Sequence, residues 1–295
     1  MFSSDFDSQH KFFDGLSFFW QKVHRDIPMM IGMYGLIVLL VFCLFADFIA
    51  PYELGHAPFI PLLPPAWSNY GDIDFFFGTD SLGRDVLSQL IYATRYSFGS
   101  ALLIMGFVGV IGISLGLIAG ITHGTRSAII NHLFNVFLAI PSLLLVIFII
   151  LFFGPSLTNV IIAITLSFLP KLIHIISNAV REEFDKEYVV ALRLDGASTW
   201  YILKDSIIPN LSPLMINELT RILSLAILDI TALGFLGLGA QGTHPEWGAM
   251  LGDILDLFFV NPSLLFLPGV TIFASVLFVN LFGDGILRMI SKRGG

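Results

Sequence analysis

The sequence predicts an all-α integral membrane protein with six transmembrane helices, and three observations support this prediction. Of its 295 residues, 56% are hydrophobic and only 13% are charged, whereas a soluble domain usually carries about 25% charged residues. The apolar residues gather in continuous blocks, and about 20 such residues cross about 30 Å of hydrocarbon as a helix. The blocks lack the alternation of apolar and polar residues that barrel strands require.

Six blocks are long enough to cross a membrane. In chain order they cover about residues 28–50, 97–121, 128–152, 157–177, 217–239 and 263–287. The first is too long for the core of a signal peptide and no small-residue cleavage pattern follows it, so we expect it to remain as an anchor. In the second, Gly112, Gly116 and Gly120 recur every four residues, a spacing that lets helix backbones approach closely.

The distribution of Lys and Arg predicts the orientation of these spans, because cytoplasmic loops carry an excess of basic residues. With the N-terminus inside, six spans also place the C-terminus inside. The inside segments then hold eleven basic residues, namely Lys11, Lys22, Arg25, Arg126, Arg181, Lys186, Arg193, Lys204, Arg288, Lys292 and Arg293. The outside segments hold only Arg84 and Arg95. Both termini are therefore predicted to be cytoplasmic.

This topology divides the chain into four parts. Residues 1–27 form a cytoplasmic tail, and residues 28–96 form the first transmembrane helix with an external segment. Residues 97–288 form the transmembrane core, and residues 289–295 form a second cytoplasmic tail.

Two external segments are too long to be simple turns, and each favours a structural role. The segment after the first span contains an amphipathic run from Val86, which we expect Thr79 or Asp80 to cap. The segment after the fifth span contains Trp247, and Trp is enriched at the membrane–water interface. We therefore expect a capped interfacial helix in one segment and an interface anchor in the other.

Charge and cysteine content exclude several functions. Fifteen Lys and Arg against 22 Asp and Glu give a formal net charge of −7, which, with no basic run, argues against nucleic acid as a partner. The single cysteine, Cys43, excludes an internal disulfide and a cysteine-based metal cage. The seven histidines show no ligand spacing, so neither a metal nor a cofactor is expected. No Gly-x-x-x-x-Gly-Lys-Ser/Thr loop occurs, so this chain is not expected to cradle ATP phosphates in that way.

The most informative segment is cytoplasmic and covers about residues 178–212. It is the densest charged region of the chain, and apolar residues recur at helical spacing between the charges. Gly196 interrupts this pattern as a tight bend, and Ser198 can cap a second short helix. A polar helix–turn–helix between two spans is typical either of a docking surface for a soluble partner or of a solvated loop, and the residues alone leave both open.

The same segment resembles the coupling loop of ABC-importer permease subunits. The resemblance covers YVVALRLDGAS at 188–198 and IPN at 208–210. Ala191, Gly196 and Pro209 match the Ala, Gly and Pro of that loop.

Two further motifs narrow the resemblance to the oligopeptide and dipeptide branch of these permeases. They are FGTDSLGRDVLS at 77–88, and FLGLGAQ at 235–241 followed by PEWGAML at 245–251. The three motifs occur in order and at suitable distances. The whole chain is most similar to the permease subunits of Sap-type peptide transporters.

The resemblance implies a type I ABC-importer permease fold and a subunit that catalyses no bond chemistry. It implies separate ATPase subunits that dock on the coupling loop, which carries over to Ala191, Gly196, Ala197, Ser198, Thr199 and Pro209. A homologous sister permease would complete the translocation path, and a periplasmic substrate-binding protein would deliver the cargo. The implied location is the lipid of a gram-negative inner membrane, and the implied cargo is peptides, including antimicrobial peptides. The alternative is a permease of a polyamine exporter, for example of putrescine.

Charged residues inside the spans are informative, because charge in hydrocarbon is costly and usually functional. Asp229 lies deep in the fifth span, and Arg221 lies about two helical turns earlier on a similar face. Glu218 is the expected local partner of Arg221. We expect Asp229 to favour cationic cargo in the translocation path or to pair with a polar group of the sister subunit.

Two other classes of membrane protein are less favoured by these charges. A secondary transporter or an ATP-independent channel would carry ionisable residues deep in several spans, whereas Lys171 is expected to snorkel towards the cytoplasmic end of its span. A purely structural scaffold would give no reason for the charged helix–turn–helix.

Overall fold

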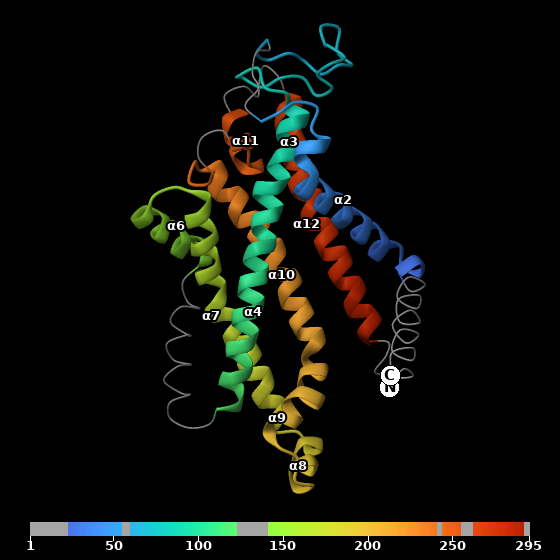
Figure 1. Cartoon of the computed structure of the whole chain (residues 1–295), viewed down its shortest axis with the longest axis vertical. Coiled ribbons are helices and arrows are strands. Elements are labelled where there is room, and N and C mark those ends of the chain that lie inside the picture. The colour runs from blue at the N-terminus through green and yellow to red at the C-terminus, as the bar shows by residue number, and fades with distance from the viewer. Residues whose placement is uncertain (1–22, 55–59, 123–140, 241–243, 255–261, 292–295) are drawn as a thin grey trace, which may run out of the picture.

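The computed structural model describes residues 23–54, 60–122, 141–240, 244–254 and 262–291. Apart from one isolated β-bridge, between Thr79 and Asp85, all regular structure in these residues is helical. The helices form an elongated bundle that ends in loops at the top of Figure 1 and in short helices at the bottom. The predicted all-α class is confirmed.

Helix α2 (Ile27–Ile49) packs antiparallel against the last helix, α12 (Pro262–Ser291). Gly32 faces Phe282 and Gly35 faces Phe278, so residue numbers rise on one helix as they fall on the other. Asp26 caps α2 and forms an ion pair with Arg288 near the end of α12, with Nε and Oδ2 2.9 Å apart. The start of α2 and the end of α12 therefore lie at the same end of the bundle, as an even number of spans requires.

Helices α3 (Val86–Thr94) and α4 (Ser100–Ile121) form one continuous rod through a π-helical turn, η1 (Arg95–Gly99). The predicted cap at Thr79 or Asp80 is wrong, because the Oδ2 atom of Asp85 accepts the N–H of Ser88 over 2.8 Å and caps α3. Asp80 instead closes a turn in which its Oδ1 atom accepts the N–H of Arg84.

The glycine face of α4 packs against α7 (Leu157–Phe184), as its spacing predicts. Gly112, Gly116 and Gly120 lie against Leu172, Ile176 and Val180, respectively. Because the residue numbers rise together, α4 and α7 are parallel, and the chain must return along the bundle between them. This requirement agrees with a span over residues 128–152, of which residues 128–140 lie outside the described residues. The described part of that span is α6 (Ser142–Phe153), which is shorter than a full crossing.

Four helices of the described residues are long and apolar enough to cross a membrane. They are Ile27–Ile49, Val86–Ile121, Leu157–Phe184 and Phe266–Ser291. A fifth long helix, α10 (Ile208–Phe235), has 28 residues and carries charged side chains in its middle. Helix therefore occurs in all six predicted ranges, although the sixfold crossing itself stays a prediction.

The two ends of the bundle are built differently. At one end lie residues 51–54 and 60–85 and the short helix α11 (Trp247–Ile254) (Figure 1). At the other end lie α8 (Glu187–Leu194), α9 (Thr199–Ile202) and a second π-helical turn, η2 (Leu203–Ile207). The helix–turn–helix predicted from sequence is therefore present. It lies at the opposite end of the bundle from the two segments that were predicted to be external.

Trp247 is not the interface anchor that its position in the sequence predicts. It has no exposed surface. Its indole Nε1 donates to the carbonyl oxygen of Leu90 over 3.4 Å, and its backbone N–H donates to Ser97 Oγ over 3.0 Å. The indole thus fastens α11 onto the α3–α4 rod.

Candidate coupling loop and transport cavity

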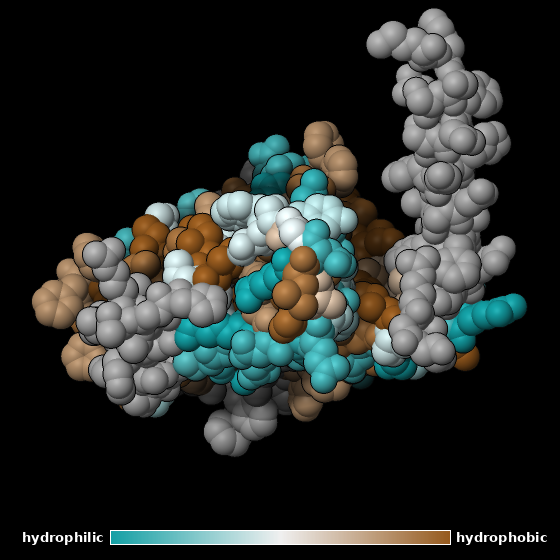
Figure 2. All heavy atoms as spheres, turned by 90° about the horizontal axis from the view of Figure 1, so that it is seen from below, coloured by the Kyte–Doolittle hydropathy of each residue, from teal (hydrophilic) through white to brown (hydrophobic). Residues whose placement is uncertain are grey.

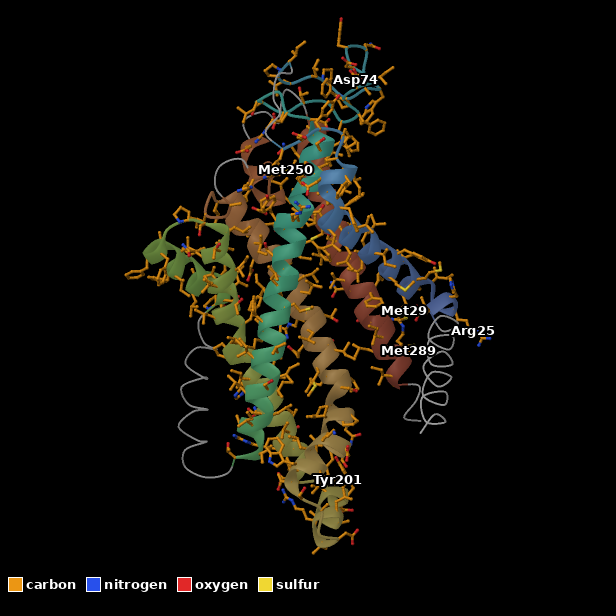
Figure 3. The ribbon with its side chains drawn as sticks, viewed as in Figure 1. Arg25, Met29, Asp74, Tyr201, Met250 and Met289 are labelled. Atoms are coloured by element: carbon orange, nitrogen blue, oxygen red, sulfur yellow. The ribbon has the colours of Figure 1, made fainter. Side chains whose placement is uncertain are left out.

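The end formed by α8 and α9 exposes large apolar side chains. Val190 and Leu194 are 47% and 84% exposed, and Trp200 and Tyr201 are 68% and 54% exposed. Figure 2 views the molecule from this end and shows apolar side chains among hydrophilic ones, and Figure 3 places Tyr201 there. We call these four residues the docking patch. Exposed apolar side chains rimmed by polar ones mark a protein-interaction surface, so the geometry favours docking over a solvated loop.

The opposite side of α8 and α9 is buried against the spans. Val189, Ile202 and Ile207 have no exposed surface and belong to the main apolar core. Each buried aliphatic side chain contributes about 1.5–3 kcal/mol relative to an exposed one. The two short helices are therefore held firmly to the bundle while the docking patch stays free.

A polar cluster ties the coupling loop to both neighbouring spans. The Tyr188 hydroxyl donates to Glu183 Oε1 over 2.7 Å, and Asn210 Nδ2 donates to the same oxygen over 3.2 Å. Lys186 Nζ lies 2.6 Å from Glu183 Oε2. Burial, helped by the Glu183 carboxylate, raises the pKa of the Tyr188 hydroxyl, which stays a donor. Because Glu183 ends α7 and Asn210 begins α10, a displacement of α8 reaches both helices.

Gly196 makes the bend between α8 and α9 that the sequence predicts. Its φ is +85°, in the left-handed region that favours glycine. The N–H of Ala197 donates to Leu192 O over 3.0 Å and the N–H of Gly196 donates to Arg193 O over 3.0 Å, the hydrogen bonds of a Schellman motif. Ser198 then caps α9, since its Oγ accepts the N–H of Tyr201 over 3.3 Å.

The structure gathers all six predicted coupling residues on this end of the molecule. Ala197 is half-buried, and the exposed ones are Ala191, Gly196, Ser198, Thr199 and Pro209. Sequence reasoning missed the docking patch and the Glu183 cluster. The signal for the patch was the occurrence of Leu194, Trp200 and Tyr201 in an otherwise polar segment.

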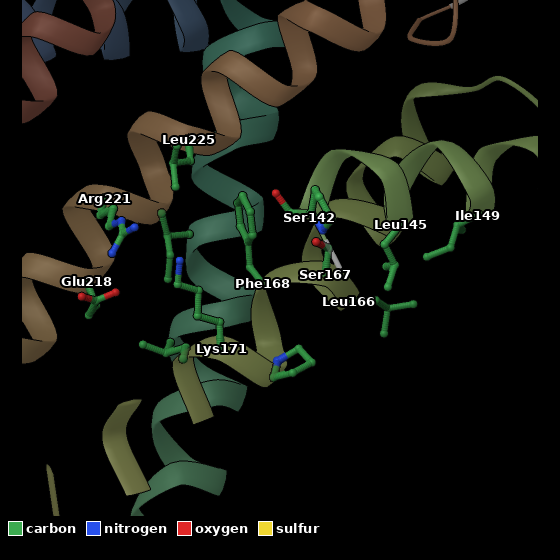
Figure 4. Close-up of a pocket in the computed structure, with 14 residues that line it drawn as sticks. Ser142, Leu145, Ile149, Leu166, Ser167, Phe168, Lys171, Glu218, Arg221 and Leu225 are labelled. Carbon is green, nitrogen blue, oxygen red and sulfur yellow. The ribbon is translucent and has the colours of Figure 1, made fainter. Parts of the chain in front are cut away.

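A cavity of about 610 Å³ opens between α6, α7 and α10. Three ionisable side chains line it: Lys171 from α7, and Glu218 and Arg221 from α10 (Figure 4). Its walls are otherwise mainly apolar. Two of the three predicted path residues, Glu218 and Arg221, therefore line the same cavity. Lys171, which was not predicted to line the path, lines it as well.

These charged residues lie deep in the bundle, as neighbouring packing shows. Leu172, next to Lys171, packs on Gly112 of α4, and Leu219, next to Glu218, packs on Gly109. At 1.5 Å per residue, Gly112 is about 14 Å from the end of α4 at Ile121 and about 18 Å from its start. Lys171 therefore lies level with the middle of α4, a helix without charged residues, and its snorkelling towards the cytoplasmic end of its span stays a prediction.

Asp229 does not line this cavity. One of its carboxylate oxygens, Oδ2, is buried and has no hydrogen-bond partner among the described residues. The expected local pair between Glu218 and Arg221 is likewise absent from the ion pairs of the described residues, which join other side chains. In the same residues, no three His, Cys, Asp or Glu side chains gather closely enough to hold a metal ion.

At the opposite end, a fully buried Glu246 joins three elements. Its Oε1 accepts the hydroxyl of Ser97 over 3.2 Å and the N–H of Gly248 over 2.8 Å, which caps α11. Its Oε2 accepts the N–H of Ala249 over 3.3 Å. A Cβ added at Gly234 of α10 would overlap this carboxylate. Burial, partly offset by these hydrogen bonds, raises the pKa of Glu246 to about 7.

The fold and the projecting coupling loop define a class: the membrane-spanning permease subunit of an ABC importer. The inward-facing MetNI methionine ABC transporter has the same fold, with a TM-score of 0.56 at 20% sequence identity over 68% of this chain and 96% of that chain. Residues 112–294 match the family model "Binding-protein-dependent transport system inner membrane component". Residues 17–65 match "N-terminal TM domain of oligopeptide transport permease C". This chain belongs to the family of binding-protein-dependent transport system inner membrane components.

Similar proteins cover nearly the whole chain. The peptide transport system permease protein SapC of Escherichia coli O6:H1 is 50% identical over 92% of both chains. SapC of Haemophilus influenzae is 42% identical over 92% of this chain and 93% of that one. The di/tripeptide transport system permease protein DppC of Pseudomonas aeruginosa is 41% identical over 91% of this chain and 89% of that one. The protein is therefore a multi-pass inner-membrane permease subunit and not itself an enzyme.

Proposed function

We propose that this chain is the permease subunit of a peptide importer, driven by ATP hydrolysis in partner subunits. The observation that carries the proposal is the coupling loop, which presents the exposed docking patch on one side and is bonded to two long helices on the other. The relatives named as peptide and di/tripeptide permeases support peptides as cargo. Antimicrobial peptides fall within that class.

The coupling step follows from the attachment of α8. An ATPase subunit docked on the patch moves Ala191, Gly196, Ala197, Ser198, Thr199 and Pro209 as a unit, because the bend at Gly196 is closed by two backbone hydrogen bonds. The Glu183 cluster passes this displacement to α7 and α10. Tilting of these helices alternates access to a path shared with a homologous sister permease.

The translocation path runs beside α10. Arg221 and Glu218 line its cavity, and Asp229 lies about two turns further along the same helix. The half-buried Asp229 either faces cationic cargo or pairs with the sister subunit.

The end with the docking patch is the cytoplasmic one in this proposal, which the excess of Lys and Arg supports. The termini then lie in the cytoplasm, with tails at 1–27 and 289–295, the first span and external segment at 28–96 and the core at 97–288. A periplasmic binding protein delivers cargo at the α11 end.

The test is reconstitution of this chain with its sister permease and ATPase subunits in liposomes. Flux of a labelled basic peptide and of putrescine is followed with and without ATP and binding protein. Gly196→Leu is compared with Gly237→Leu, because Gly237 ends α10 with φ +71° and also has open space around its Cβ position. Both variants strain the backbone, but only Gly196 lies in the coupling loop.

We expect inward peptide flux that needs ATP and binding protein and that Gly196→Leu reduces far more than Gly237→Leu does. Outward putrescine flux would instead support the exporter. Flux that is indifferent to ATP and to Gly196→Leu would overturn the permease assignment and favour a channel.

A further inference from the structure

The cavity between α6, α7 and α10 holds an unusual set of charges for the middle of a membrane bundle. Lys171 and Arg221 are exposed side chains that line it, whereas Glu218 is only 8% exposed. None of the ion pairs formed within the described residues involves any of the three. Charges at this depth are stabilised by facing a cavity and by a partner of opposite sign, so Lys171 and Arg221 call for an anionic group and Glu218 calls for a cationic one.

The cavity has the size and walls of a small-molecule site. Its volume of about 610 Å³ lies within the range of about 300–1,000 Å³ for such sites. Phe168 of α7, Leu145 of α6 and Leu225 of α10 supply apolar surface (Figure 4). Ser142 and Ser167 add neutral polar groups.

We propose that this cavity binds the two charged ends of a short peptide in transit. Arg221 holds the α-carboxylate, since its planar guanidinium can bind both oxygens, and Lys171 adds a second cation to the same group. Glu218 accepts the α-ammonium. The apolar walls take side chains without fixing their identity. This inference rests on the proposed function, because it names what the path recognises in its cargo.

A zwitterionic ligand satisfies all three side chains at once, which argues against the simpler alternative. An acidic residue of the sister permease could pair with Lys171 and Arg221 and would bring the net charge of the cluster from +1 to zero, but it would supply no cation for Glu218. A peptide brings a cation for Glu218 together with the anion for the two bases. The site therefore recognises the two charged ends of the peptide and accepts different sequences between them.

The test uses the complete transporter in detergent, without binding protein and without ATP, so that only the permease pair can bind peptide. The probes are trialanine with free ends, its C-terminal amide and its N-acetyl form, measured by isothermal titration calorimetry. We expect each blocked form to bind about tenfold or more weakly, because a charge-assisted hydrogen bond is worth about 1.5–3 kcal/mol. If the wild-type complex bound the free and blocked peptides equally, the inference would be wrong. This comparison needs no variant.

The variants separate the two ends of the ligand. Arg221→Gln should weaken trialanine about tenfold and leave the amide unchanged, whereas Glu218→Gln should lose discrimination against the N-acetyl form. Lys171→Arg should keep the preference for a free carboxylate. Arg288→Gln is the matched control, because Arg288 pairs with Asp26 away from the cavity.

The outcomes also distinguish this inference from the proposed function. If Arg221→Gln releases the sister permease and changes all peptides equally, the cations pair with the sister chain and the inference fails. If ATP-driven peptide flux persists but the ends of the peptide do not matter, the inference fails and the proposed function stands. If the wild type moves no peptide, the proposed function fails first.

Discussion

The buried carboxyl of Glu246 makes the stability of this protein depend on pH in a predictable direction. Its pKa of about 7, raised from 4.5 mainly by burial, means that the folded protein holds a proton that the unfolded chain has released. The contribution is therefore complete below about pH 4.5 and is lost as the pH rises through about 7. At 1.36 kcal/mol per pKa unit, the whole effect is about 3 kcal/mol, of which about 2 kcal/mol falls between pH 5.5 and pH 8.

Glu246→Gln isolates this effect, because the amide resembles the protonated carboxyl in size and does not titrate. Its carbonyl oxygen can still accept the N–H of Gly248 and the hydroxyl of Ser97. Its NH₂ group faces the N–H of Ala249, so one weak hydrogen bond is lost. We therefore expect a loss of about 1 kcal/mol at pH 5.5 and stability equal to or above that of the wild type at pH 8.

The assay is thermal unfolding of the purified permease in detergent at pH 5.5 and at pH 8. We expect the wild type to lose several degrees in melting temperature between the two pH values, and Glu246→Gln to lose much less. Asp74→Asn is the control, because Asp74 is exposed at the same end of the molecule and should leave the wild-type slope intact (Figure 3). Equal pH dependence in wild type and Glu246→Gln would refute the reasoning.

Four further substitutions test helix packing, a hydrogen bond and an ion pair. Gly116→Ala should destabilise the bundle by about 1–3 kcal/mol, because its Cβ would press on Ile176, whereas Gly106→Ala, with open space, should be neutral or stabilising in the same denaturation assay. Tyr188→Phe should cost about 1 kcal/mol and reduce peptide-stimulated ATP hydrolysis, because Glu183 loses a hydrogen bond; unchanged coupling would contradict the transmission through this cluster. Arg288→Ala should lower the free energy of unfolding by at most about 1 kcal/mol, since its ion pair with Asp26 is partly exposed. A larger loss of stability in melting experiments would mean that this ion pair contributes more than surface ion pairs usually do.

Features set by neighbouring residues in the chain could be predicted from the sequence. The bend at Gly196 and the cap at Ser198 depend on local backbone geometry, and both are found. The glycine face of α4 was readable because small residues at every fourth position share one side of a helix.

Features set by the register between helices could not be predicted. The positions of Lys171 and Glu218 along the bundle depend on the register of α7 and α10 against α4. The sequence of no single helix determines that register. The burial of Trp247 depends on Leu90 and Ser97, about 150 residues earlier in the chain. Asp85 outcompeted Thr79 and Asp80 as the cap because those two residues bond within the preceding loop.

Helix α10 is one continuous helix that connects the two ends of the molecule. It begins beside the Glu183 cluster, and it ends where Gly234 touches the Glu246 carboxyl. From Pro213 to Gly234 it is about 32 Å long, so a tilt of about 5° about one end moves the other by about 3 Å. A hydrogen bond breaks when its donor and acceptor move apart by that distance. Under the proposed function, a small rotation imposed at the coupling loop is therefore enough to loosen the contacts around α11 at the other end of the bundle.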